Sequence, residues 1–188
     1  MSNYLLIKQG TIHNAIEEEP FVADILVENG KIKKIAPVLE GKIINDAEVI
    51  DAMGIDIYPG FVDAHCHMGL DGYATGFAGE DYNELGDPVT PQLSAVDAVN
   101  PQDETFQMAR EGGVCTGPGS SNVIGGTFCA IKTYGKRVDD MLVKEKTAMK
   151  IAFGENPKNC YKEKGVYSRM SVAAKLREAL IKAKIYDR

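Results

Sequence analysis

The first 58 residues consist of short runs of alternating apolar and polar positions, which is the pattern of β-strands. The dipeptide Asn29-Gly30 separates two such runs and favours a hairpin turn, because both of its residues tolerate positive φ. In the run that follows, Ile32 and Ile35 are apolar but are interrupted by lysines, so we expect a bulge or a twist there. The N-terminal part is therefore predicted to be all-β, with strands near residues 4–8, 23–28, 31–35, 48–51 and 55–58.

After Gly60 the pattern changes to short apolar runs alternating with helical segments. Such alternation predicts a parallel sheet with crossover helices, and therefore an α/β fold. Residues 69–99 are acidic and glycine-rich without a clear period, which is typical of a functional or disordered loop. The expected strands are 61–66, 114–116, 128–134 and 148–153. The expected helices are 100–112, a short helix near residue 156, and a long helix that starts at Ser168 or Ser171. The long helix should bury a stripe formed by Val172, Leu176, Leu180 and Ala183.

The composition is that of an ordinary globular protein. The chain has 188 residues, is 44% hydrophobic and has a formal net charge of −6. This balance argues against a protein that coats nucleic acid or anionic lipid, and no apolar run approaches the ~20 residues that cross a bilayer. No secretory signal is recognisable, and the cysteines form no Cys-x-x-Cys pair, so we expect a cytoplasmic protein with reduced thiols at Cys66, Cys115, Cys129 and Cys160.

The candidate chemistry lies in residues 59–67, Pro-Gly-Phe-Val-Asp-Ala-His-Cys-His. On a strand, Asp63, His65 and His67 would share one face, with the two histidines about 7 Å apart at their origins. Their rings would then converge on one metal ion, and Asp63 would orient one of the ligands. The His-x-His pattern also occurs as two satisfied polar residues of a strand, so the residues alone leave both interpretations open.

Residues 59–67 resemble the first barrel strand of the amidohydrolase superfamily. Residues 112–113, 117–127 and 149–157 are similar to a subgroup related to imidazolonepropionase. The resemblance implies the first three or four βα units of a (β/α)₈ TIM-type barrel at residues 59–188. It also implies that residues 1–58 are the N-terminal part of a small β-sandwich domain.

The resemblance also implies the hydrolysis of C–N bonds in a small amide or cyclic amide. One or two divalent metals are expected, zinc first, with iron, manganese or nickel as alternatives. His65 and His67 match the family's first two ligands. Glu155 is a candidate for a metal-bridging carboxylate, although it also suits the first turn of a helix. Residues 117–127 form a glycine-rich loop, in which Ser120, Ser121 and Asn122 are candidates for contact with a substrate. A plain tight loop is an equally good interpretation.

This chain contains too few residues and too few histidines for the family's complete metal site. A full barrel takes roughly 250 residues, and no histidine follows His67. We therefore assign no catalytic residue and expect an incomplete hydrolase chain, supplemented by a missing C-terminal half or a second chain, with a homo-oligomer as one form. The alternative is an inactive, amidohydrolase-like assembly module. A simple metal carrier is weaker, because two ligands retain a metal poorly. The strand 114–116 is short, which indicates a natural deletion or absent residues.

Overall fold

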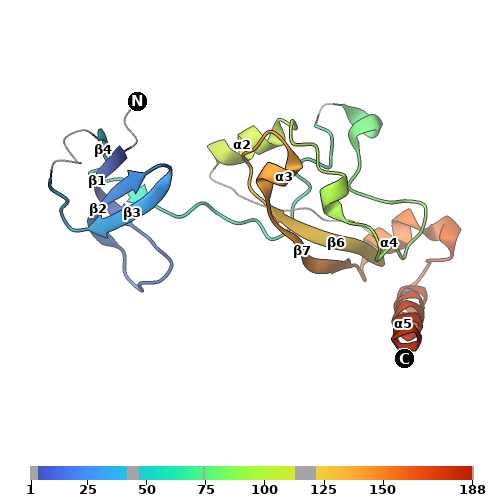
Figure 1. Cartoon of the computed structure of the whole chain (residues 1–188). Coiled ribbons are helices and arrows are strands. Elements are labelled where there is room, and N and C mark those ends of the chain that lie inside the picture. The colour runs from blue at the N-terminus through green and yellow to red at the C-terminus, as the bar shows by residue number, and fades with distance from the viewer. Residues whose placement is uncertain (1–3, 42–46, 74, 113–121, 188) are drawn as a thin grey trace. The chain divides into compact units, whose positions relative to one another are not determined.

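The computed structural model describes residues 4–41, 47–73, 75–112 and 122–187 (Figure 1). The chain divides into two compact units, residues 1–61 and 62–188. In the described residues, the first unit contains strands, and the second contains helices and a two-stranded sheet. The fold is therefore a mixed α/β fold.

The first unit is built on a five-stranded sheet. Its order is β3-β2-β1-β4, and β5 also pairs with β1. The neighbours β1, β2 and β3 run antiparallel, whereas β4 and β5 lie parallel to β1. The strands are β1 (Tyr4–Ile12), β2 (Phe21–Glu28), β3 (Lys31–Ala36), β4 (Glu48–Asp51) and β5 (Asp56–Ile57).

The hairpin between β2 and β3 confirms the prediction from the Asn-Gly dipeptide. Asn29 and Gly30 have φ of 51° and 74°, the left-handed values that such a turn requires. Leu26 pairs with Lys34 whereas Val27 pairs with Ile32, so Lys33 is the extra residue of a bulge. The interrupted apolar alternation of β3 therefore reflects a real irregularity of the ladder.

A buried carboxylate, Asp24, joins β2 to two irregular segments. Its oxygens accept hydrogen bonds from Gln9 N at 2.9 Å, Leu39 N at 3.0 Å and Gln9 Nε2 at 3.3 Å. Gln9 has a φ of 55° and interrupts the β1–β2 pairing, so the carboxylate replaces ladder bonds that this bulge lacks. Burial by itself raises the pKa of Asp24, but the donated hydrogen bonds outweigh burial and hold the pKa below its usual value.

The second unit is organised around one long hairpin. The strands β6 (Ile124–Ile131) and β7 (Leu142–Ile151) pair antiparallel. Figure 1 shows α2 and α3 near one end of this ribbon and α4 near the other. The remaining elements are η1 (Gly76–Gly79), η2 (Ala95–Asp97), α2 (Thr105–Glu111), α3 (Val138–Met141), α4 (Glu155–Cys160), η3 (Lys162–Lys164) and α5 (Arg169–Tyr186).

Two apolar clusters lie at the two ends of β6. At its C-terminal end, Ile131 packs in a cluster with Leu70, Val99, Phe106, Cys129 and Met141. At its N-terminal end, Ile124 packs in a cluster with Val123, Tyr161, Val166 and Val172. β6 therefore contributes to both cores of the unit, and each cluster buries residues from at least three separate segments.

The predicted parallel arrangement is wrong for the strands of this unit that the structure describes. Only residues 132–141 connect β6 to β7, and a parallel crossover needs a dozen residues or more. The expected strand 128–134 begins earlier, at Ile124, and the expected strand 148–153 belongs to the longer β7. The expected strand 114–116 lies outside the described residues.

Two helices illustrate how side chains set helix boundaries. The prediction that a helix starts at Asn100 is wrong, and α2 begins only at Thr105. The Asp103 carboxylate accepts hydrogen bonds from both the backbone N–H and the hydroxyl of Thr105, and such local bonds favour a helix start at this point. The long C-terminal helix is confirmed: Ser168 caps α5 by accepting a bond from Ser171 N at 3.3 Å. Its predicted stripe is buried at Val172 but is 59% exposed at Leu180.

No helix among the described residues has both the length and the apolar character needed to cross a bilayer. Of the cysteines that the structure describes, Cys129 and Cys160 are free thiols. Cys115 lies outside the described residues.

Replacing Asp24 with Asn should lower the free energy of unfolding at pH 7 by about 1–3 kcal/mol, because one buried donor loses its acceptor. The lowered pKa stabilises the fold above the ordinary value of 3.8, and this stabilisation is lost as the pH falls through the folded-state pKa. The difference between wild type and variant should therefore shrink below about pH 4. Denaturant unfolding at pH 7 and pH 3 measures it. Glu40→Gln, at an exposed position, is the control, and an equal difference at both pH values would contradict the assignment.

Candidate functional site

His65 and His67 lie on a bent segment and not on a strand. The predicted strand 61–66, with Phe61, Asp63, His65 and His67 on one face, is wrong: the backbone bends at residues 64–65. Asp63 Oδ1 accepts a hydrogen bond from His65 N at 3.0 Å and closes a local turn. An aspartate that bonds the backbone two residues later offers an alternative to strand pairing, which explains the bend.

The bend nevertheless brings the two imidazoles together. Their ring centroids are 5.8 Å apart, and the ring planes are inclined by 57°. The ring of Phe128, on β6, meets His65 edge-on at 5.4 Å, and Tyr82 stacks on His67 at 5.0 Å with a 9° angle between planes. Each imidazole is therefore oriented by an aromatic neighbour from a distant part of the chain.

His67 is adapted to remain neutral. Partial burial is the largest cause that lowers its pKa, and the neighbouring charges of His65 and Lys150 lower it further. Asp71 acts in the opposite direction without cancelling these effects. A neutral imidazole is the form that binds metals, so the environment of His67 suits a ligand.

The spacing of the pair fits a shared metal ion. An ion bound to one nitrogen of each ring at about 2.1 Å lies about 3.2 Å from each ring centre, so two rings that share it are at most about 6.4 Å apart. The observed 5.8 Å is within this limit. The two residues can therefore supply two positions of a metal site.

Within the described ranges, no group of three or more His, Cys, Asp or Glu residues is placed to hold a metal ion. Glu155 is exposed and is the first residue of α4, which matches its alternative interpretation as a first-turn helix residue. Its role as a metal ligand stays a prediction. The described residues thus provide a pair of ligands and not a complete set.

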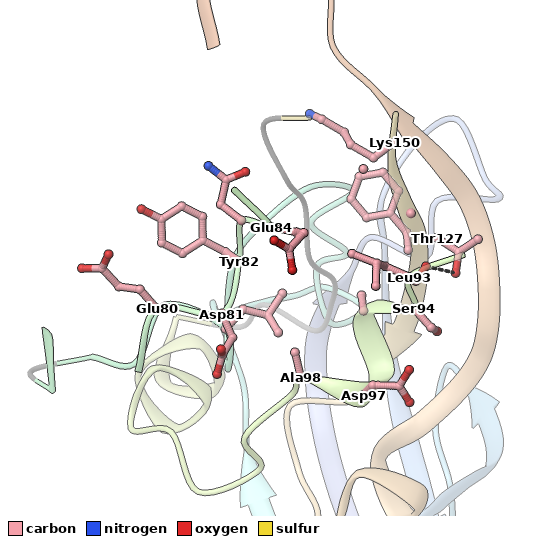
Figure 2. Close-up of a pocket in the computed structure, with 16 residues that line it drawn as sticks. Glu80, Asp81, Tyr82, Glu84, Leu93, Ser94, Asp97, Ala98, Thr127 and Lys150 are labelled. Carbon is pink, nitrogen blue, oxygen red and sulfur yellow. Dashed lines mark hydrogen bonds between the residues drawn. The ribbon is translucent and has the colours of Figure 1, made fainter. Parts of the chain in front are cut away.

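A cavity of about 300 Å³ lies next to the aromatic residues that contact the histidines (Figure 2). Tyr82 and Phe128 belong to its wall, and so does Lys150 on β7. The other lining residues come from segment 80–98, from β6 and from Leu70: Glu80, Asp81, Asn83, Glu84, Leu93, Ser94, Ala95, Asp97, Ala98, Gly125, Gly126 and Thr127.

Gly126 makes one wall of this cavity possible. A Cβ at this position would lie 2.5 Å from Leu93 O, and Gly126 has a φ of 93°. Thr127 N donates to Leu93 O at 2.9 Å, which holds β6 against the start of η2. At Gly126 the backbone of β6 therefore lies directly against the backbone of Leu93.

Asn122 is fully buried and holds the segment before η2. Its side-chain amide donates to Asp87 O at 2.9 Å, Glu84 O at 3.0 Å and Thr90 Oγ1 at 3.2 Å. These bonds account for the side chain without a substrate, so its contact with a substrate stays a prediction. The other two loop candidates, Ser120 and Ser121, lie outside the described residues.

The comparisons with known proteins agree with this picture. The solved structure of an amidohydrolase from Thermotoga maritima matches 97% of this chain at 40% identity with a TM-score of 0.85. Amidohydrolase TasK from Hapsidospora irregularis is 33% identical over 156 residues, which is 75% of this chain. Dihydroorotase from Aquifex aeolicus is 42% identical over 64 residues, 34% of this chain. No family model matches the sequence.

This chain, with its mixed α/β fold and its sheets like those of the Thermotoga maritima protein, belongs to the amidohydrolase superfamily and corresponds to its N-terminal part. It spans 48% of the Thermotoga maritima chain, and the matched segments cover 16% and 14% of the two curated relatives.

Sequence reasoning missed three residues around the histidine pair: Tyr82, Phe128 and Lys150. Tyr82 lies in the segment 69–99, whose composition indicated no specific contact. Lys150 carried no distinctive signal, because a charged residue between the apolar Met149 and Ile151 is the ordinary alternation of a strand.

In the metal-free chain, His67 should titrate below the ordinary histidine value of 6.5, and His65→Ala should raise its pKa by removing a neighbouring positive charge. Imidazole NMR signals followed against pH measure both effects. His13→Ala is the matched control, because His13 belongs to the first unit and does not contribute to the shift. Titration of His67 at or above 6.5 would contradict the stated environment.

Asn122→Ala should lower the free energy of unfolding by about 1–3 kcal/mol, because buried acceptors in segment 84–90 lose their donor. Amide hydrogen exchange in that segment should also become faster. Asn159→Ala, at an exposed position of α4, is the control. If the two variants had equal stability, Asn122 would not be what holds the segment.

Proposed function

We propose that this chain is part of a metal-dependent hydrolase that cleaves C–N bonds in a small amide or cyclic amide. The observation that carries the proposal is the pair His65 and His67, with ring centroids 5.8 Å apart beside a cavity of about 300 Å³. Its membership of the amidohydrolase superfamily supports the same reaction class.

The residues have distinct proposed roles. His65 and His67 hold a divalent metal, zinc first, with iron, manganese or nickel as alternatives and one or two ions in the complete site. When bound, the metal supplies an activated water and polarises the carbonyl group. Asp63 positions His65 through its backbone bond, and Glu155 is the proposed carboxylate ligand. Tyr82 and Phe128 keep the two imidazoles in their orientations.

We further propose that the site is completed by residues other than those described here. A catalytic zinc normally has three protein ligands, and the described residues supply a pair. Residues 59–188 would form the first units of a (β/α)₈ barrel, and residues 1–58 would form part of a small β-sandwich. A missing C-terminal region or a second chain would supply the remaining ligands. The imidazolonepropionase-related subgroup is the proposed placement.

A second candidate function is an inactive, amidohydrolase-like module that assembles with other chains. It is favoured by the apolar side chains that α5 exposes, Met170, Leu180, Ile181 and Ile185. Large exposed apolar surfaces are typical of interaction sites. Metal content separates the two candidates.

With Glu155 as the proposed third ligand, the wild-type chain should retain zinc after equilibration and dialysis. His65→Ala and His67→Ala should each lose at least about nine-tenths of it, because the two ligands that remain hold zinc weakly. Elemental analysis of the dialysed protein measures this. His13→Ala removes the one remaining histidine of the chain and should leave the zinc content unchanged.

Hydrolysis of cyclic amides, assayed on the same preparations, should depend on His65 and His67. A wild-type chain that retains no zinc and forms a stable oligomer would favour the assembly module. Zinc retention that is insensitive to both substitutions would contradict the proposed ligands.

A further inference from the structure

Lys150 is a partly buried cation in the wall of the cavity. It lies near the end of β7, in the ladder opposite the β6 residues that also line the cavity. Among the described residues, no carboxylate lies within 4.0 Å of its ammonium group, whereas lysines and arginines elsewhere make four such contacts with carboxylates. Burying a charge without a partner is costly, so this position favours an anionic partner. In agreement, burial lowers the pKa of Lys150.

The cavity has its lysine at one end and two aspartates at the other. Figure 2 shows Lys150 at the upper end, and Asp81 and Asp97 at the lower end. Among the described residues of the wall, Lys150 is the one cation, and the carboxylates are those of Glu80, Asp81, Glu84 and Asp97. Figure 2 labels Glu84 between Lys150 and the two aspartates. An anionic group is therefore attracted at the Lys150 end and repelled at the opposite end.

Ser94 provides a second polar position. Within the described part of the chain, its hydroxyl oxygen is the one buried side-chain polar atom without a hydrogen-bond partner. Ser94 lines the cavity close to the apolar residues Leu93 and Ala95. A buried hydroxyl that bonds nothing destabilises the protein, and a ligand with a polar group would satisfy it.

We propose that this cavity binds a small amide that carries one carboxylate, with the carboxylate at Lys150 and the remainder of the molecule extending towards Ser94. The inference rests on the proposed function, because it names the substrate class of the same site. The cavity of about 300 Å³ suits a small ligand, since such sites usually measure about 300–1,000 Å³. The carboxylates at the far end disfavour a second carboxylate on the ligand.

Titration of the metal-free chain with three matched probes tests the proposal. N-acetylglycine has one carboxylate, N-acetylglycinamide has none, and N-acetylaspartate has two. N-acetylglycine should bind at least about tenfold more tightly than the neutral amide, because a hydrogen bond to a charged group is the stronger one. It should also bind more tightly than the dicarboxylate. Equal affinity for the acid and the neutral amide, or no binding of N-acetylglycine, would overturn the proposal.

Lys150→Met should remove the preference for N-acetylglycine, and Lys150→Arg should retain most of it. Lys146→Met is the matched control, because Lys146 is an exposed lysine of the same strand outside the cavity. Unchanged affinity in Lys150→Met would overturn the assignment. Ser94→Ala is a second test variant, and it leaves no buried donor unpaired. It should weaken the binding of N-acetylglycine and of N-acetylglycinamide by about two- to tenfold. An unchanged affinity for both probes would exclude Ser94 as a contact.

Zinc retention measured on the same variants distinguishes this inference from the proposed function. Lys150→Met should keep the wild-type zinc content, because Lys150 is not a ligand. A chain that binds N-acetylglycine through Lys150 but retains no zinc would contradict the proposed hydrolase alone. A chain that retains zinc but shows no preference for the acid would contradict the substrate class alone.

Discussion

The second unit depends on how β6 holds the irregular segment 84–98. Thr90 N donates to Ile124 O at 2.8 Å, Ile124 N donates to Pro88 O at 3.2 Å, and Thr127 N donates to Leu93 O at 2.9 Å. The buried amide of Asn122 adds three side-chain bonds to the same segment. Because this segment has one short 3₁₀ turn and no strand, these contacts take the place of a regular ladder.

The candidate site follows from this attachment. β6 carries Phe128, which contacts His65, and its partner β7 carries Lys150. The held segment supplies Leu93, Ser94 and Ala98 to the cavity wall. The histidine pair is brought together separately, by the local turn that Asp63 closes. The turn closed by Asp63 and the attachment of segment 84–98 to β6 therefore together place the two histidines next to the cavity.

The elements that sequence reasoning predicted well are those whose cause is local. The Asn29-Gly30 turn follows from the φ values that the two residues accept, and the start of α5 follows from the Ser168 cap. Both depend on atoms within a few residues of one another. The strand expected at residues 61–66 failed for the opposite reason: extended structure needs partner strands, and here a side chain bonds the local backbone instead.

The sequence by itself determined three things: two imidazoles separated by one residue, a β-rich N-terminal part, and an acidic chain with motifs of one superfamily. Tertiary structure decided the antiparallel pairing of β6 with β7, the burial of Asn122 and the place of Lys150 in a cavity wall. The physical reason is that side-chain type and local turns are encoded within a few residues. Burial and charge environment, in contrast, depend on which distant segments pack together.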